Sequence, residues 1–187
     1  LCILSFDDGY KDFLDISKKY FKKRNVSVNQ NVIIKSVISG LPPINVYFQD
    51  FIGSAPLKLV NELKVENFEL KQFKNKFDFG NSVSNFIKNK PILYQKNILS
   101  SCQDTINKFD NFIPTPMLSL EDLNYLKLNH ELGAHSYEHA SMENESNIYF
   151  SEDLKKCRLF FLEKLLFAPY IYAFPNGSYQ NKNLKEL

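Results

Sequence analysis

The chain has 187 residues, of which 44% are hydrophobic and 24% are charged, and its formal net charge is +2. This length and composition are ordinary for one globular domain with a buried core. Because the net charge is near zero, no electrostatic footprint typical of nucleic-acid or anionic-membrane binding stands out. No apolar run is long enough to span a bilayer. We therefore expect no nucleic-acid partner and no membrane span.

The cysteines and the two ends of the sequence carry limited information. Cys2, Cys102 and Cys157 are odd in number and share no spacing typical of a metal site, which favours reduced thiols over a disulfide framework. The sequence opens at Leu1 inside an apolar run and stops at Leu187 inside an apparent helix start. We interpret it as an excerpt of a longer protein, so the lack of a signal peptide says nothing about localisation.

The first elements are expected to alternate between strand and helix. Residues 1–6 form an apolar run that predicts a buried strand, ended by a polar Asp-Asp-Gly turn. Residues 12–23 have apolar side chains at helical spacing. Residues 26–38 are rich in β-branched side chains and predict a second strand, before a turn at 40–43.

The middle of the chain, from about residue 47 to residue 112, predicts a helical insertion. It is rich in Asn, Lys and Phe, and its apolar residues recur at spacings of three and four. The pattern indicates two to four helices, broken near Gly80 and at Pro91. We interpret its aromatic stripe as core packing.

The last third of the chain again alternates between predicted helices and predicted strands. Ser119 is a predicted N-cap of a helix, residues 131–134 predict a short strand, and Ser151 is a predicted N-cap of the next helix. Residues 170–174 predict a final strand, stopped by Pro-Asn-Gly. This order is the βαβ alternation of a parallel α/β sheet or barrel.

Polar clusters follow three of the predicted strands. These clusters are Asp7 with Asp8, His135 with His139, and the turn at 175–177. In parallel α/β folds, ligands and catalytic groups collect at the carboxyl ends of strands. An Asp-Gly pair alone is a common turn signal. The four-residue spacing of the histidines predicts both imidazoles on one side of a helical turn, either as metal ligands or as a surface coincidence.

Together the clusters predict metal-assisted hydrolysis. Two neutral imidazoles and one carboxylate suit zinc or a similar ion. A second carboxylate beside the site can then accept the proton of a water molecule as a general base.

Three segments resemble motifs of a known family, the polysaccharide deacetylases with the NodB homology domain. Residues 5–9 (SFDDG) resemble the first motif of that family. Residues 135–139 (HSYEH) are similar to its second motif, and the preceding residues 130–134 are similar to the lead-in. Residues 172–179 (YAFPNGSY) resemble its third motif.

The resemblance implies a fold, an activity and a cofactor. The fold is a distorted (β/α) barrel of the NodB type, incomplete at the C-terminus, with the helical insertion at about 47–112. The activity is removal of acetyl groups from an N-acetylated or O-acetylated polysaccharide, with a divalent metal, zinc above all, as cofactor. Family analogy suggests a cell-envelope or secreted protein.

The resemblance also implies residue roles. Asp7 is the general base, and Asp8, His135 and His139 hold the metal. The backbone N–H of Asn176 stabilises the oxyanion of the tetrahedral intermediate. His130 is buried or lies behind the ligands. The remaining substrate-binding residues implied by the third motif are Pro175, Gly177 and Tyr179.

This sequence also departs from the family pattern. Members usually carry a later motif whose His protonates the leaving amine, and many carry an Arg in the third motif that pairs with the catalytic Asp. No His follows His139, the third motif has no Arg, and the sequence has no Trp. Truncation explains the missing acid most simply, so we expect this excerpt to have weak or no turnover. Two alternatives stay open: a hydrolase of a small non-peptide C–N bond on the same fold, and a catalytically silent glycan-binding domain.

Overall fold

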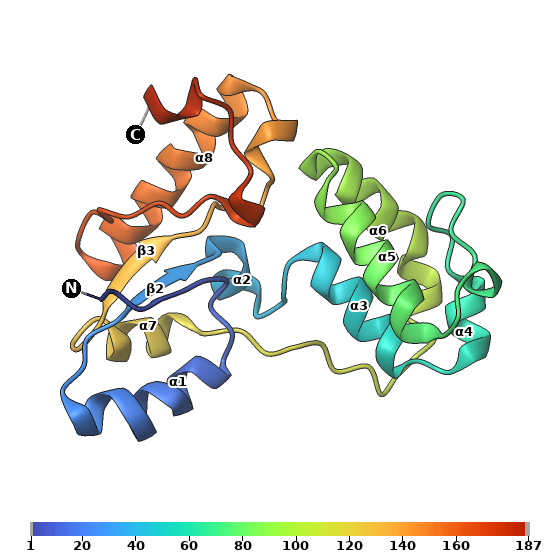
Figure 1. Cartoon of the computed structure of the whole chain (residues 1–187), viewed down its shortest axis with the longest axis horizontal. Coiled ribbons are helices and arrows are strands. Elements are labelled where there is room, and N and C mark those ends of the chain that lie inside the picture. The colour runs from blue at the N-terminus through green and yellow to red at the C-terminus, as the bar shows by residue number, and fades with distance from the viewer. Residues whose placement is uncertain (1, 186–187) are drawn as a thin grey trace. The chain divides into compact units, whose positions relative to one another are not determined.

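The computed structural model describes residues 2–185, and the chain divides into two compact units. One unit contains the residues on either side of the middle segment, 1–41 and 116–187, and we call it the α/β unit. The other unit is the middle segment, 42–115, and we call it the helical unit. Figure 1 shows the strands in the first unit and a group of helices in the second.

A three-stranded parallel sheet lies at the centre of the α/β unit within the described residues. Its strands are β1 (Ser5–Phe6), β2 (Asn29–Val32) and β3 (Glu131–Ala134), in the order β1-β2-β3. A single parallel bridge from Ala134 to Tyr172 continues the sheet beyond β3. Because all pairings are parallel, the carboxyl ends of the strands meet at one edge of the sheet.

Helices pack around these strands and share one hydrophobic core with them. The most deeply buried side chains of this core include Val32, Leu123 and Phe161. The helices of the α/β unit are α1 (Asp12–Ile16), α2 (Ile34–Ser39), α7 (Leu120–Leu126) and α8 (Asn147–Phe160). Short turns extend α1 as far as Arg24 and α8 as far as Leu165. The predicted helix at 12–23, the Ser119 cap and the strand at 131–134 are confirmed.

The helical unit has its own hydrophobic core, which includes the buried rings of Phe48, Phe51 and Phe79. Its helices are α3 (Ile44–Ser54), α4 (Leu57–Glu62), α5 (Lys76–Lys88) and α6 (Ile92–Ile106). The predicted break at Pro91 is confirmed, because Pro91 is the residue before α6. The predicted break at Gly80 is wrong, because Gly80 lies inside α5.

Gly80 has a packing role instead. A Cβ at this position would lie 3.3 Å from Cγ2 of Ile52 on α3. The missing side chain therefore lets α5 and α3 approach closely, which outweighs the low helix propensity of glycine.

Two strand predictions near the N-terminus are wrong in extent. The predicted strand at 1–6 covers only Ser5–Phe6, and Ile3 is 75% exposed, so the run is not buried; Leu1 lies outside the described residues. The predicted strand at 26–38 stops at Val32, and α2 follows it. Ile34 and Val37 are buried on a helix face, a case in which packing overrides the β preference of branched side chains.

Two later predictions are also corrected. Ser146, not Ser151, is the N-cap of α8, and its side chain accepts a hydrogen bond from the Tyr149 N–H at 3.1 Å. The segment 170–174 forms the single bridge at Tyr172 rather than a strand.

The α/β architecture with a parallel sheet agrees with the sequence-based prediction, but the barrel is not confirmed. Within residues 2–185 the sheet has three strands and does not close. In the same residues, no helix is both long enough and apolar enough to cross a membrane.

Candidate metal centre and active site

The first pair of acidic residues lies in a tight turn at the end of β1. Asp8 and Gly9 both have positive φ values, 72° and 82°. A Cβ at Gly9 would lie 3.1 Å from Cγ1 of Val32, so glycine suits both the backbone conformation and the close approach to β2. The turn places Asp7 and Asp8 at the carboxyl edge of the sheet.

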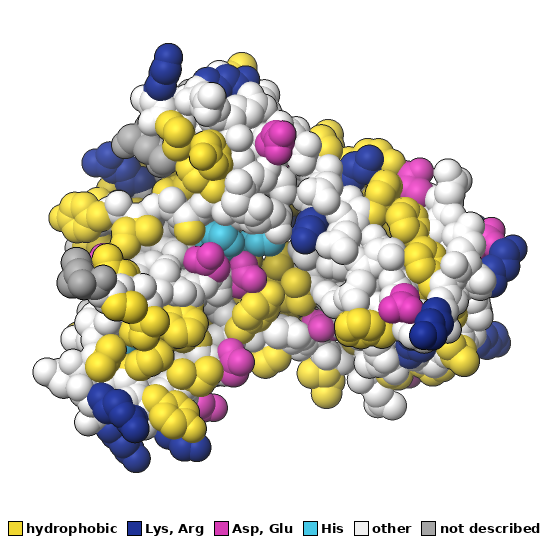
Figure 2. Space-filling model, in the orientation of Figure 1, with side chains coloured by type: hydrophobic (Ala, Val, Ile, Leu, Met, Phe, Trp, Pro, Cys, Tyr) yellow, Lys and Arg dark blue, Asp and Glu magenta, His cyan; other side chains and the backbone are white. Residues whose placement is uncertain are grey.

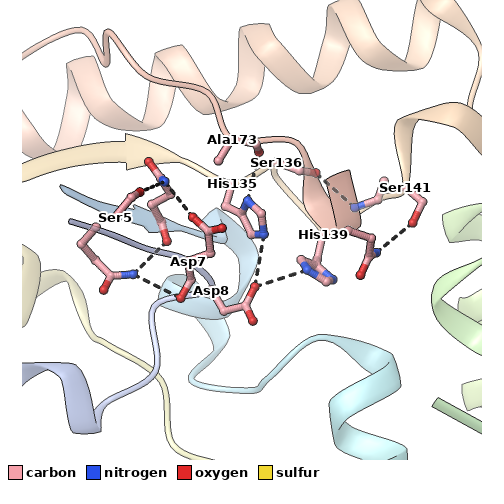
Figure 3. Close-up of polar contacts among 12 residues, drawn as sticks. Ser5, Asp7, Asp8, His135, Ser136, His139, Ser141 and Ala173 are labelled. Carbon is pink, nitrogen blue, oxygen red and sulfur yellow. Dashed lines mark hydrogen bonds and ion pairs between the residues drawn. The ribbon is translucent and has the colours of Figure 1, made fainter. Parts of the chain in front are cut away.

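Asp8 meets two histidines at this edge. Its Oδ1 lies 3.2 Å from Nε2 of His135 and 3.3 Å from Nε2 of His139 (Figure 3). One ligand atom from each of the three residues falls within 4.8 Å of the other two. Both histidines are buried, whereas the side chain of Asp8 is 23% exposed. Figure 2 shows histidine beside acidic side chains at the surface of the α/β unit.

The hydrogen bond on the other side of His135 defines its tautomer. Nδ1 of His135 lies 3.0 Å from the carbonyl oxygen of Ala173. A carbonyl can only accept, so Nδ1 carries a proton, and when the ring is neutral Nε2 directs its lone pair at Asp8. A lone pair facing a carboxylate oxygen is unfavourable unless a cation lies between them. The donor set therefore fits a divalent metal, and two imidazoles with one carboxylate fit zinc.

The electrostatics of Asp8 and His139 favour the protonation states that bind a metal. Burial raises the pKa of Asp8, but the contacts with His135 and His139 outweigh burial and hold this pKa well below its usual value. Burial lowers the pKa of His139, against the opposing effect of Asp8. An ionised carboxylate and a neutral imidazole are the forms that bind metal.

The second motif is a loop rather than a helical turn. Ser136 and His139 both have left-handed backbone conformations, with φ values of 66° and 62°. The predicted helical turn across 135–139 is therefore wrong, although both imidazoles do reach Asp8.

Asp153, a buried residue of α8, holds this loop. Its Oδ1 accepts hydrogen bonds from Oγ of Ser136 at 2.8 Å and from the Tyr137 N–H at 2.9 Å. Its Oδ2 accepts from the hydroxyl of Tyr172 at 3.0 Å. Sequence reasoning missed this role. The available signal was an acidic residue on the buried face of α8, in helical register with Phe150 and Cys157.

The third motif lies beside the second. Pro175–Gly177 form a 3-10 turn in which Asn176 has a left-handed conformation, with φ 57° and ψ 16°. Nδ2 of Asn176 donates to Oγ of Ser141 at 2.9 Å, which ties the turn to the segment after His139. Tyr179 packs against Phe174, with ring centroids 5.0 Å apart, and is 45% exposed.

His130 is separate from the ligands, as predicted. It is buried, and its Nε2 lies 2.7 Å from Oγ of Ser17. Its ring packs edge-on against Phe13 and Phe21. Burial lowers the pKa of His130, which is consistent with a neutral core histidine.

Comparison with known proteins bears on the same residues. A family model described as polysaccharide deacetylase matches residues 123–187, a segment that contains His135, His139 and the third motif. The resemblance to the polysaccharide deacetylases is confirmed. Asp7 and Asp8 lie outside the matched segment.

Two solved structures resemble this chain in fold. The deacetylase PplD from Streptococcus pyogenes, in complex with acetate, is 15% identical to this chain, and the TM-score is 0.55. The match covers 98% of this chain and 50% of the PplD chain. IcaB from Ammonifex degensii is 14% identical to this chain, and the TM-score is 0.52. The match covers 99% of this chain and 54% of the IcaB chain. The chain thus spans about half the length of either structure. Among curated protein sequences, none matches this chain.

Proposed function

We propose that this chain forms the metal-binding part of a hydrolase that removes acetyl groups from an N-acetylated or O-acetylated polysaccharide. The observation that carries the proposal is the position of Asp8. One of its two carboxylate oxygens, Oδ1, faces Nε2 of both His135 and His139. A second carboxylate, Asp7, is the adjacent residue. The family match over the second and third motifs supports the acetylated glycan as substrate.

In this proposal the two carboxylates have different roles. Asp8, His135 and His139 hold a divalent metal, with zinc as the best fit to this donor set. When bound, such a metal polarises the acetyl carbonyl and lowers the pKa of water. Asp7 accepts the proton of the attacking water as a general base.

The third motif supplies the remaining contacts. The backbone N–H of Asn176 donates to the oxyanion that forms as water adds to the carbonyl carbon. Pro175 and Gly177 shape the turn that presents this N–H. The half-exposed ring of Tyr179 offers an apolar face to a sugar ring.

Two parts of the proposal concern the protein as a whole. Protonation of the leaving amine is not assigned to a histidine of this chain, because two of the three act as ligands and His130 is buried against Ser17. The chain as a whole represents a partial catalytic domain, with the helical unit as an insertion.

The test compares two variants in the full natural protein. We expect His135→Ala to lose bound zinc, and Asp7→Asn to keep zinc while acetate release from acetylated chito-oligosaccharides falls by about 10²- to 10⁴-fold. Zinc content is measured by mass spectrometry. His130→Gln serves as the matched control, because it changes a histidine outside the ligand set and should keep zinc.

Two results would contradict the proposal. Full acetate release by Asp7→Asn would exclude Asp7 as the base. Faster turnover of small amides than of acetylated oligosaccharides would instead support the smaller C–N substrate.

A further inference from the structure

The central strand of the sheet is polar where an apolar strand is expected. Three consecutive residues of β2, Asn29, Gln30 and Asn31, are 5%, 0% and 2% exposed. Central strands of parallel sheets are ordinarily rich in Val, Ile and Leu, and burying an amide costs free energy unless it is hydrogen-bonded. The partners of these amides therefore indicate why polar residues occupy this strand.

Asn31 directs its amide nitrogen at the proposed base. Nδ2 of Asn31 donates to Oδ1 of Asp7 at 2.7 Å and to Oγ of Ser5 at 3.2 Å. Oγ of Ser5 in turn donates to Oδ1 of Asn29 at 2.7 Å. This chain of donors fixes the amide orientation, because the reversed amide would place Oδ1 of Asn31 against the Asp7 carboxylate.

Gly133 on β3 makes room for the Asn31 side chain. Asn31 and Gly133 are paired in the register between β2 and β3. A Cβ at Gly133 would lie 2.1 Å from Oδ1 of Asn31 and 3.1 Å from the carbonyl oxygen of Ile171. Any larger residue at Gly133 would displace the Asn31 amide, so the two positions act as a pair.

We propose that Asn31 is a positioning residue that holds Asp7 as the base and separates it from the metal ligands. This inference rests on the proposed function. Asp7 and Asp8 are adjacent and chemically identical, so an unrestrained Asp7 could swing toward the cation. Among residues 2–185, no Lys or Arg forms an ion pair with Asp7. A neutral amide donor restrains one carboxylate oxygen and leaves the group its negative charge.

The first test is kinetic and uses the full natural protein. Asn31→Leu removes the hydrogen-bond donor and keeps a side chain of similar size. We expect it to lower kcat for acetate release by about 10- to 100-fold, because a misplaced base accepts the proton of water less efficiently. KM and zinc content should stay within about twofold, since Asn31 contacts neither substrate nor metal. Asn45→Leu is the matched control: it makes the same change at a buried asparagine of the helical unit, whose amide donates to Oγ of Ser84, and it should cost far less.

A double variant separates positioning from a general packing effect. If Asn31 acts through Asp7, Asn31→Leu should cause no further fall in kcat in an Asp7→Asn background. An equal further fall in that background would overturn the inference, as would an unchanged kcat in Asn31→Leu or equal losses of kcat in Asn31→Leu and Asn45→Leu.

A second measurement decides the inference if the Asn31 variant fails to fold, and it needs neither metal nor turnover. In ¹⁵N-labelled, metal-free protein, the side-chain amide of Asn31 should show slow hydrogen exchange that is lost in Asp7→Ala. Unchanged exchange in Asp7→Ala would overturn the inference. A wild-type protein that releases no acetate would contradict the proposed function, and the exchange measurement would still decide whether Asn31 holds Asp7.

Discussion

At the scale of single residues, neighbours give chemically identical side chains different roles. Asp8 faces two imidazole nitrogens, whereas Asp7 accepts a hydrogen bond from the amide of Asn31. The carbonyl of Ala173 fixes which nitrogen of His135 is left to bind a metal. Loss of such a contact behind a ligand typically lowers metal affinity by about 10- to 100-fold.

Asp153 gives a prediction at this scale. We expect Asp153→Asn to weaken zinc binding by about 10- to 100-fold. An asparagine amide has one acceptor oxygen and one NH₂ donor, so it cannot replace a carboxylate that accepts hydrogen bonds at both of its oxygens. Those donors include the hydroxyl groups of Ser136 and Tyr172. Zinc affinity is measured by competition with a chromophoric chelator.

Asp104→Asn is the control for this prediction, since Asp104 is an exposed residue of α6 in the helical unit. Equal zinc affinity in Asp153→Asn and wild type would show that the second-motif loop keeps its shape without the carboxylate.

The sequence predicted the candidate ligands but not the residues that contact them. The acidic pair 7–8 and His135 follow predicted strands, which indicated that they lie at one edge of the sheet, and the family resemblance implied Asp8 as the ligand. Asn31 and Asp153 act through contacts with Asp7 and Ser136, which are 24 and 17 residues away in sequence. No local spacing encodes such a contact, so these roles emerged only from the fold.

At the scale of elements, the N-terminus of α7 combines a capping box with an ion pair. Oγ of Ser119 accepts from the Asp122 N–H, and Oδ2 of Asp122 accepts from the Ser119 N–H at 2.8 Å. The same carboxylate pairs with Lys11, in the segment that follows Asp8 and Gly9. α7 therefore connects directly to the turn that carries the acidic pair.

This arrangement predicts a pH-dependent stability. Burial raises the pKa of Asp122, but Lys11 and Ser119 outweigh burial and lower it below the usual 3.8. A carboxylate whose pKa is lower in the folded state stabilises the fold at pH values above its pKa in the unfolded state. This contribution is lost as the pH falls through the pKa of the folded state. We expect Asp122→Asn to cost about 1 kcal/mol in the free energy of unfolding at pH 7.

Urea unfolding at several pH values measures this difference. The gap between wild type and Asp122→Asn should be constant above pH 3.8 and close at lower pH. Asp110→Asn, at an exposed position, should show little change at any pH. A gap that stayed open in strong acid would mean that the carboxylate charge is not the source of the stabilisation.

Element types were more predictable than element lengths. The helix after Ser119 and the strand at 131–134 carry clear local signals, a capping box and a short apolar run, and both are confirmed. The strand predicted at 26–38 was too long because Ile34 and Val37 suit either a strand or a buried helix face. Only packing against the core separates those two cases.

At the scale of the whole molecule, the chain has two hydrophobic cores with no residue in common within the described part. Phe51 belongs to the core of the helical unit, and Leu123 belongs to the core that supports the sheet. The sequence predicted helices in the middle segment from their spacing. The hydrophobic pattern of the sequence does not show whether the sheet closes into a barrel, because closure depends on how many strands pair.

The separate cores predict separate consequences of core mutations. Phe51→Ala should destabilise the helical unit by about 3–5 kcal/mol through the cavity it leaves, and should leave zinc affinity unchanged. Leu123→Ala should cost about 2–5 kcal/mol and lower zinc affinity, because α7 packs in the same core as β2 and β3. Thermal unfolding followed by circular dichroism and zinc titration at low temperature measure both effects. Equal loss of zinc affinity in the two variants would contradict this separation.

The proposed metal centre consists of Asp8, His135 and His139. X-ray absorption at the zinc edge of the zinc-loaded protein identifies the atoms bound to the metal. The predicted spectrum has two imidazole nitrogens at about 2.0–2.1 Å, carboxylate or water oxygens, and no sulfur. A sulfur shell at about 2.3 Å, or a spectrum without imidazole scattering, would contradict it.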